Sequence, residues 1–265
     1  QSSMAHISAR AKTGTIWIVV AFGGGQIIRL ASNIALAALL FQEAFALMAL
    51  VAAVMQGLAM FSDLGLKPSV VQNPRGDEPV FLQTAWTLQT IRGGILFIGA
   101  AALAWPMAHI YGANDPMARE LLWLIPLVAL GAIADGFQSS RMLTAARRMD
   151  LASVTKIELL VQVLNAVLMV GLAWYLRSVY ALAIAGVVSS GLRVWLSYAM
   201  LSGMTDRFRL DRDSVKAIFG FGKWVFLSTM ISFLALQIDR VLLAAIFPLA
   251  EVGVYSIATS LSLMV

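Results

Sequence analysis

The chain has 265 residues, of which 60% are hydrophobic and 12% charged, whereas soluble domains carry about 25% charged residues. This composition excludes an ordinary soluble enzyme and a disordered protein, and the lack of cysteine excludes a disulfide framework and thiol chemistry. The net charge of +5 is assigned to membrane orientation rather than to binding of nucleic acid. We therefore expect an all-α, polytopic transmembrane helix bundle.

Seven apolar stretches are long enough to cross a bilayer, which takes about 20 helical residues. In chain order they cover residues 15–40, 44–62, 80–105, 118–140, 152–175, 178–202 and 218–247. A further apolar helix begins at Gly253 and stops at Val265, too short to span. We therefore expect a truncated eighth helix and interpret the chain as the amino-terminal part of a longer protein.

The distribution of basic residues predicts the orientation of the chain. Twelve of them fall in the amino-terminal tail and in alternate links, against two, Arg119 and Arg177, in the other links. Because basic residues are retained on the cytoplasmic side, the amino terminus is expected there. The twelve are Arg10, Lys12, Lys67, Arg75, Arg141, Arg147, Arg148, Lys156, Arg207, Arg209, Arg212 and Lys216.

Three arginines, Arg29, Arg92 and Arg193, lie deep inside predicted spans, whereas Lys223 and Arg240 lie toward the two ends of the last span, where they can reach the interfaces. A charge at such depth costs about 3 kcal/mol on insertion scales, so it indicates a functional site by default. Arginine pairs bidentately with phosphate, and the predominance of arginine favours an anionic ligand such as a pyrophosphate. The alternative is that these arginines brace the bundle by pairing with Asp135, Asp239 or backbone carbonyls.

Helical spacing places further polar residues on shared faces of four spans, which predicts a common water-filled cavity. The faces are Gln26, Arg29 and Asn33; Gln89 and Arg92; Asp135 and Gln138; and Glu158, Gln162 and Asn165. The residues predicted to bind substrate are Gln26, Arg29, Asn33, Gln89, Arg92 and Arg193. Asp135 and Asp239 are candidates for ion coupling, or for pairing with an arginine.

No catalytic motif is found, so we expect neither an enzyme nor a cofactor or metal site. Gly23–Gly25 is not a nucleotide loop, since no strand precedes it; it predicts either a hinge or close helix packing. The acidic residues at 206, 211 and 213 are interleaved with arginines, which favours a solvated link at the membrane surface over a glycosyl- or phosphotransferase site.

Several segments, in consistent order, resemble a known transporter family. They are Phe61–Gln72, Ala145–Asp150, Tyr180–Gly186, Phe219–Gly222, Gln237–Val241 and Glu251–Ser256. The chain resembles the Wzx-type lipid-linked oligosaccharide flippases, which are polysaccharide biosynthesis transporters of the multidrug/oligosaccharidyl-lipid/polysaccharide exporter superfamily. That family has about 12 to 14 helices in two six-helix lobes around a cationic cavity.

The resemblance implies a cytoplasmic tail at 1–14, a first lobe at 15–202, a link at 203–217 and the start of a second lobe at 218–265. It also implies that Arg29 and Arg92 face the cavity. The expected function is translocation of an undecaprenyl-pyrophosphate-linked oligosaccharide across the bacterial inner membrane, by alternating access, for O-antigen, capsule or exopolysaccharide synthesis. Expected partners are that lipid, membrane lipids, and polysaccharide polymerase and chain-length proteins.

Two other transport functions remain open. A cation-coupled multidrug exporter would need an acidic or apolar cavity, which the buried arginines argue against. A peptidoglycan lipid-precursor flippase would need a cationic cavity of the same kind, and only the Phe61–Gln72 segment favours the polysaccharide branch.

Overall fold

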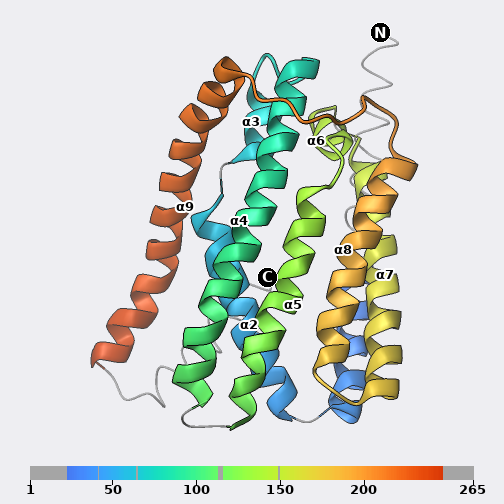
Figure 1. Cartoon of the computed structure of the whole chain (residues 1–265), viewed down its shortest axis with the longest axis vertical. Helices are drawn as coiled ribbons and strands as arrows, with labels where there is room; N and C mark the ends of the chain where they lie inside the picture. The colour runs from blue at the N-terminus through green and yellow to red at the C-terminus, as the bar shows by residue number, and fades with distance from the viewer. Residues whose placement is uncertain (1–22, 41, 64, 113–115, 149, 247–265) are drawn as a thin grey trace.

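The computed structural model describes residues 23–40, 42–63, 65–112, 116–148 and 150–246, with the side chains of 42–43 and 232–246 outside the description. Within these residues the chain forms helices and connecting turns and no strand. Most of the long helices run side by side along the bundle (Figure 1). The expectation of an all-α membrane helix bundle is confirmed, because five of the described helices are long and apolar enough to cross a bilayer.

Each of the seven predicted spans overlaps a helix in its described residues, and five of these helices qualify as membrane spans by length and composition. The first helix covers 23–39 in its described part. The remaining helices, in chain order, are α2 (Gln42–Phe61), α3 (Leu66–Gln72), α4 (Pro79–Gly112), α5 (Leu121–Gly136), α6 (Arg141–Arg147), α7 (Leu151–Leu176), α8 (Tyr180–Met200) and α9 (Arg212–Ile246). A short 3₁₀ turn, Pro116–Glu120, leads into α5.

Three details differ from the sequence prediction. The predicted span at 118–140 is too long, because α5 ends at Gly136 and the chain turns before α6 begins at Arg141. The predicted span at 80–105 is too short, since α4 continues through Pro106 to Gly112. Two short helices, α3 and α6, lie in segments that were expected to be connecting links or span ends.

Two apolar cores contact α4 at different levels, and a third lies among α6, α7 and α8. Phe81, Leu82, Ala85 and Leu88 belong to a core that α3, α6 and α9 complete. Ala100, Ala104 and Ala108 belong to a second core with the first helix, α2, α5, α7 and α8. The stretch of α4 between these cores, from Gln89 to Leu96, lines a cavity.

The segments that close one end of the bundle are α3, α6 and the link from α8 to α9 (Figure 1). They carry five of the twelve basic residues used for the orientation prediction, namely Lys67, Arg141, Arg147, Arg207 and Arg209. Arg141 on α6 fixes the start of the link, since its guanidinium donates hydrogen bonds to the carbonyl oxygens of Tyr198, Leu201 and Met204 at 2.9, 2.7 and 3.2 Å.

Candidate functional site

A cavity of about 1030 Å³ lies between the two cores, on the inner faces of α2, α4, α5 and α8, with α3 at one end and Thr229 of α9 at its edge. It brings together four of the residues singled out from the sequence as site candidates. They are Gln89, Arg92, Asp135 and Arg193. The cavity therefore brings together the predicted polar faces of the third and fourth spans, together with Arg193 of the sixth.

Arg92 enters this cavity from α4 and is held by neutral groups. Its Nε donates to Ser62 Oγ at 3.1 Å, and its Nη2 donates to the carbonyl oxygen of Ala59 at 2.9 Å. Ala59 lies in the last turn of α2, whose carbonyls lack helical partners and carry the negative end of the helix dipole. No carboxylate among the described residues forms an ion pair with Arg92, so its charge is available to an anion.

Arg193 reaches the same cavity from α8 and is partly neutralised. Its Nη1 lies 3.4 Å from Asp135 Oδ1 on α5, and Ser190 Oγ donates to Asp135 Oδ2 at 3.4 Å. The Arg193 side chain keeps 35% exposure, while its buried Nε has no hydrogen-bond partner in the described structure. Through its Nη1, Arg193 therefore braces α5, as the alternative hypothesis expects. This contact does not use its Nε.

Gln89 caps the carboxyl end of α5. Its Nε2 donates to the carbonyl oxygens of Asp135, Gly136 and Gln138, at 3.1, 3.4 and 3.2 Å. Thr90 Oγ1 donates to the Gly136 carbonyl at 3.0 Å. The last carbonyls of a helix have no partners within the helix, so these side chains of α4 satisfy the end of α5.

The cavity wall depends on a close crossing of α4 and α5 at Gly93 and Gly136. A Cβ atom on Gly93 would lie 2.6 Å from the carbonyl oxygen of Ala132 and 3.2 Å from Gly136 Cα. A Cβ on Gly136 would in turn lie 3.4 Å from Gly93 Cα. Small residues allow this approach of two membrane helices, which brings Arg92 and Asp135 to one cavity.

The sequence reasoning missed two charged residues of the cavity, Asp63 and Lys67. Both lie around the turn between α2 and α3, and Lys67 was counted only toward orientation. Gly65 allows this turn because its φ is +57° and because a Cβ there would lie 2.9 Å from Val225 Cγ2 of α9. The lining thus contains three basic side chains and two carboxylates.

The remaining polar faces do not line this cavity. Gln26, Arg29 and Asn33 are exposed on the first helix. On α7, Gln162 Nε2 donates to the Gly25 carbonyl at 3.0 Å, and Ser189 Oγ of α8 donates to Asn165 Oδ1 at 2.8 Å.

Two further hypotheses from the sequence concern the glycine run at 23–25 and Asp239. Gly25 packs closely, since its Cβ would lie 2.8 Å from Gln162 Oε1, whereas Gly23 and Gly24 have open space. This geometry favours helix packing over a hinge at Gly25. Asp239, the second candidate for ion coupling, has a side chain outside the described residues.

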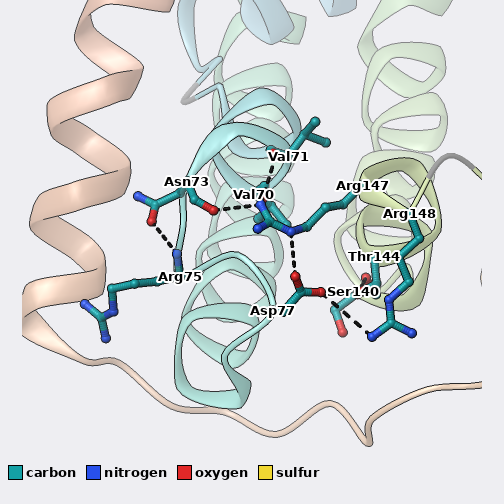
Figure 2. Close-up of polar contacts among 9 residues, drawn as sticks. All are labelled: Val70, Val71, Asn73, Arg75, Asp77, Ser140, Thr144, Arg147 and Arg148. Carbon is teal, nitrogen blue, oxygen red and sulfur yellow. Dashed lines mark hydrogen bonds and ion pairs between the residues drawn. The ribbon is translucent and has the colours of Figure 1, made fainter.

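Arg147 fixes α3, which closes one end of the cavity with Leu66, Lys67 and Pro68. Figure 2 shows its guanidinium at the carboxyl end of α3. Its Nη1 donates to the carbonyl oxygens of Val70, Val71 and Asn73 at 2.8, 2.9 and 2.7 Å, and its Nε lies 2.8 Å from Asp77 Oδ2. The position of Lys67 therefore depends on α6.

Comparison with known proteins adds one finding. The sequence model of a family described as polysaccharide biosynthesis protein matches residues 35–265. That range contains all the cavity-lining residues. No curated protein and no solved structure gives a significant match.

Proposed function

The chain belongs to the polysaccharide biosynthesis protein family, and from this membership we propose that it translocates an undecaprenyl-pyrophosphate-linked oligosaccharide across the bacterial inner membrane. The observation that carries the proposal is Arg92, a cavity arginine held by neutral oxygens of Ala59 and Ser62. An arginine that lies inside the membrane and has no carboxylate partner is suited to bind an anionic ligand. Its planar guanidinium can pair with two oxygens of a phosphate.

In this proposal Arg92 binds one phosphate and the free Nε edge of Arg193 approaches the other. The distance of 3.4 Å between Arg193 and Asp135 allows the guanidinium to turn toward a ligand while it keeps its partner on α5. Lys67, at the α3 end of the cavity, adds positive charge on the side from which we propose that the substrate enters. The polyprenyl tail stays in the bilayer.

Translocation requires that the cavity open to each side of the membrane in turn, as in transporters built from two rocking halves. We propose that this chain supplies one such lobe and acts as a transporter rather than as an enzyme. The exposed Gln26, Arg29 and Asn33 face would border the pathway between the lobes, and Asp135 is the described candidate for ion coupling. The end that carries the basic links would lie in the cytoplasm.

The test uses the full-length protein in vesicles whose inner leaflet holds an oligosaccharide lipid. A membrane-impermeant sugar-modifying enzyme outside the vesicles reports arrival of the lipid. We expect transfer of the pyrophosphate-linked lipid and slower transfer of the same sugar on a monophosphate. Transfer of neither lipid, with export of a lipophilic cation instead, would replace the proposal by a multidrug exporter.

The peptidoglycan precursor is the second competing substrate. It also carries a polyprenyl pyrophosphate, so it is added to the same vesicles as a separate assay. Faster transfer of this precursor than of any surface-polysaccharide lipid would assign the chain to peptidoglycan synthesis. The reverse order supports a role in O-antigen, capsule or exopolysaccharide synthesis.

A further inference from the structure

The link from α8 to α9 is fixed against the helices beneath it, although it has no helical structure itself at residues 201–211. Its backbone N–H at Arg209 donates to Thr87 Oγ1 at 3.0 Å, and the N–H at Asp211 donates to Thr84 Oγ1 at 3.2 Å. Both threonines are buried side chains of α4. The link therefore lies at a defined level along α4.

The carboxylate of Asp206 fixes the preceding part of the link. It accepts hydrogen bonds from Ser139 Oγ at 3.0 Å, from the Ser140 N–H at 3.2 Å and from Ser140 Oγ. These serines form the turn between α5 and α6. Asp206 thus turns toward the protein, and the arginines beside it are left as the outward charges.

The length of α4 places this level at the boundary of the bilayer. Its 34 residues extend over about 50 Å, whereas the hydrocarbon core is about 30 Å thick. Trp105, 63% exposed near the other end of α4, is typical of a membrane interface. About 20 residues before Trp105, one membrane thickness away, lie Thr84 and Thr87.

Basic and apolar side chains alternate along the link. One side of the Phe208 ring packs against Trp86 of α4, with ring centroids 4.9 Å apart, yet Phe208 and Leu210 remain 67% and 58% exposed. Arg207, Arg209 and Arg212 are exposed as well. None of these three guanidinium groups forms an ion pair within the part of the chain that the structure describes.

The carboxylates close to the link form their hydrogen bonds with other groups. Asp211 accepts hydrogen bonds from the Ser214 N–H and Oγ at 2.9 and 2.7 Å, and beyond ion-pair distance it interacts electrostatically with Arg75 and Arg209. Asp213 interacts electrostatically with Arg75. The outward face of the link is therefore apolar and cationic together, which is the composition of segments that lie in the headgroup region of a membrane.

We propose that residues 207–212 form a binding site for anionic phospholipids, in which Phe208 and Leu210 enter the acyl boundary and Arg207, Arg209 and Arg212 bind the headgroup phosphates. The site is separate from the cavity and does not depend on the proposed function. Its role is to hold the link, and with it the start of α9, at the membrane surface. Fixed basic residues at an anionic leaflet attract its lipids strongly.

The test uses the natural absence of cysteine. The variant Leu210→Cys carries an environment-sensitive fluorophore, and the protein is placed in vesicles of phosphatidylcholine and phosphatidylglycerol. Bromine atoms, which quench the fluorophore on contact, are placed on the acyl chains of one lipid or the other at equal mole fraction. We expect several-fold stronger quenching by brominated phosphatidylglycerol than by brominated phosphatidylcholine.

Matched variants test whether these three arginines cause the preference for phosphatidylglycerol, rather than any positive charge at the same end of the protein. The triple change R207Q/R209Q/R212Q should remove the preference for phosphatidylglycerol and leave quenching by both lipids equal. The change Arg148→Gln should keep the preference, because Arg148 is exposed at the same end but faces Asp77 at 3.8 Å. Equal quenching with all arginines present would overturn the proposal, as would no quenching by either lipid, which would place the link in water or against another protein.

Discussion

The guanidinium of Arg92 on α4 donates a hydrogen bond to the carbonyl oxygen of Ala59 in the last turn of α2, at 2.9 Å. Arg92 thereby caps a helix end, and it forms no ion pair with any residue that the structure describes. The turn that follows α2 lies close to α9, since a Cβ on Gly65 would lie 2.9 Å from Val225 Cγ2.

The glycine crossing of α4 and α5 gives a stability prediction. Gly93→Ala places a methyl group against the backbone oxygen of Ala132 at 2.6 Å, which a side-chain rotation cannot relieve. Overpacking of this kind costs about 1–3 kcal/mol, so the midpoint of thermal unfolding in detergent should fall. The control is Gly94→Ala, where nothing lies within 4 Å; an equal fall in both variants would contradict the packing argument.

Arg147 gives a prediction for α3. Arg147→Gln removes the charge that binds three carbonyls and Asp77, and a glutamine is too short to replace them. Amide hydrogen exchange at 66–72 should become faster, and Lys67 should lose its fixed place at the cavity.

The same contact predicts that Gly76→Ala acts like Arg147→Gln. A Cβ at Gly76 would lie 2.1 Å from the Val70 carbonyl oxygen and 2.6 Å from Arg147 Nη1. Arg148→Gln serves as the control, because its contact with Asp77 is long, at 3.8 Å, and 70% of its side chain is exposed. Unchanged exchange at 66–72 in Gly76→Ala would show that α3 is held by other contacts.

Asp211 gives a pH prediction at the start of α9. Hydrogen bonds from the Ser214 hydroxyl and N–H lower the pKa of the Asp211 carboxyl below its usual range. Because the pKa is lower in the folded than in the unfolded chain, where it is about 3.9, the ionised carboxyl stabilises the fold at pH values above the unfolded-state pKa. This stabilisation is lost as the pH falls through the folded-state pKa. Exchange protection factors at 213–215 should therefore decrease below about pH 4.

The control for this titration is Asp211→Ala, which lacks the hydrogen bonds from Ser214 to the carboxylate at every pH. Its protection factors at 213–215 should be low and should change little over the same pH range. A decrease in this variant equal to that of the native chain would assign the pH effect to another group, such as the exposed Asp213.

The sequence predicted the helices because apolar runs of bilayer length have few alternatives in a chain with this composition. It also predicted that Arg92, Asp135 and Arg193 approach one cavity, since charges at membrane depth need partners or water. It did not predict the end of α5 at Gly136, because the partners that satisfy the freed carbonyls, Gln89 and Thr90, come from α4, far away in the sequence.

Lys67 and Asp63 were missed for a different physical reason. Both lie in a polar segment that reads as a surface link, and only the left-handed Gly65 and the α3 contact with Arg147 turn this segment over the cavity. The polar face of α7 contacts neighbouring helices instead of this cavity. Gln162 and Asn165 satisfy backbone and hydroxyl groups of neighbouring helices, a use that spacing along one helix does not distinguish from a cavity.

The central claim is that Arg92 binds the anionic group of the transported lipid, and the most direct test compares initial rates of transfer in vesicles for native protein, Arg92→Ala and Gly94→Ala. Hydrogen bonds to a charged group contribute about 1.5–3 kcal/mol, so Arg92→Ala should slow transfer of the pyrophosphate-linked lipid at least about tenfold. Gly94→Ala, two residues along α4 and free of contacts, should keep the native rate. Native rates in a folded Arg92→Ala protein would show that this arginine only caps α2, and would contradict the account.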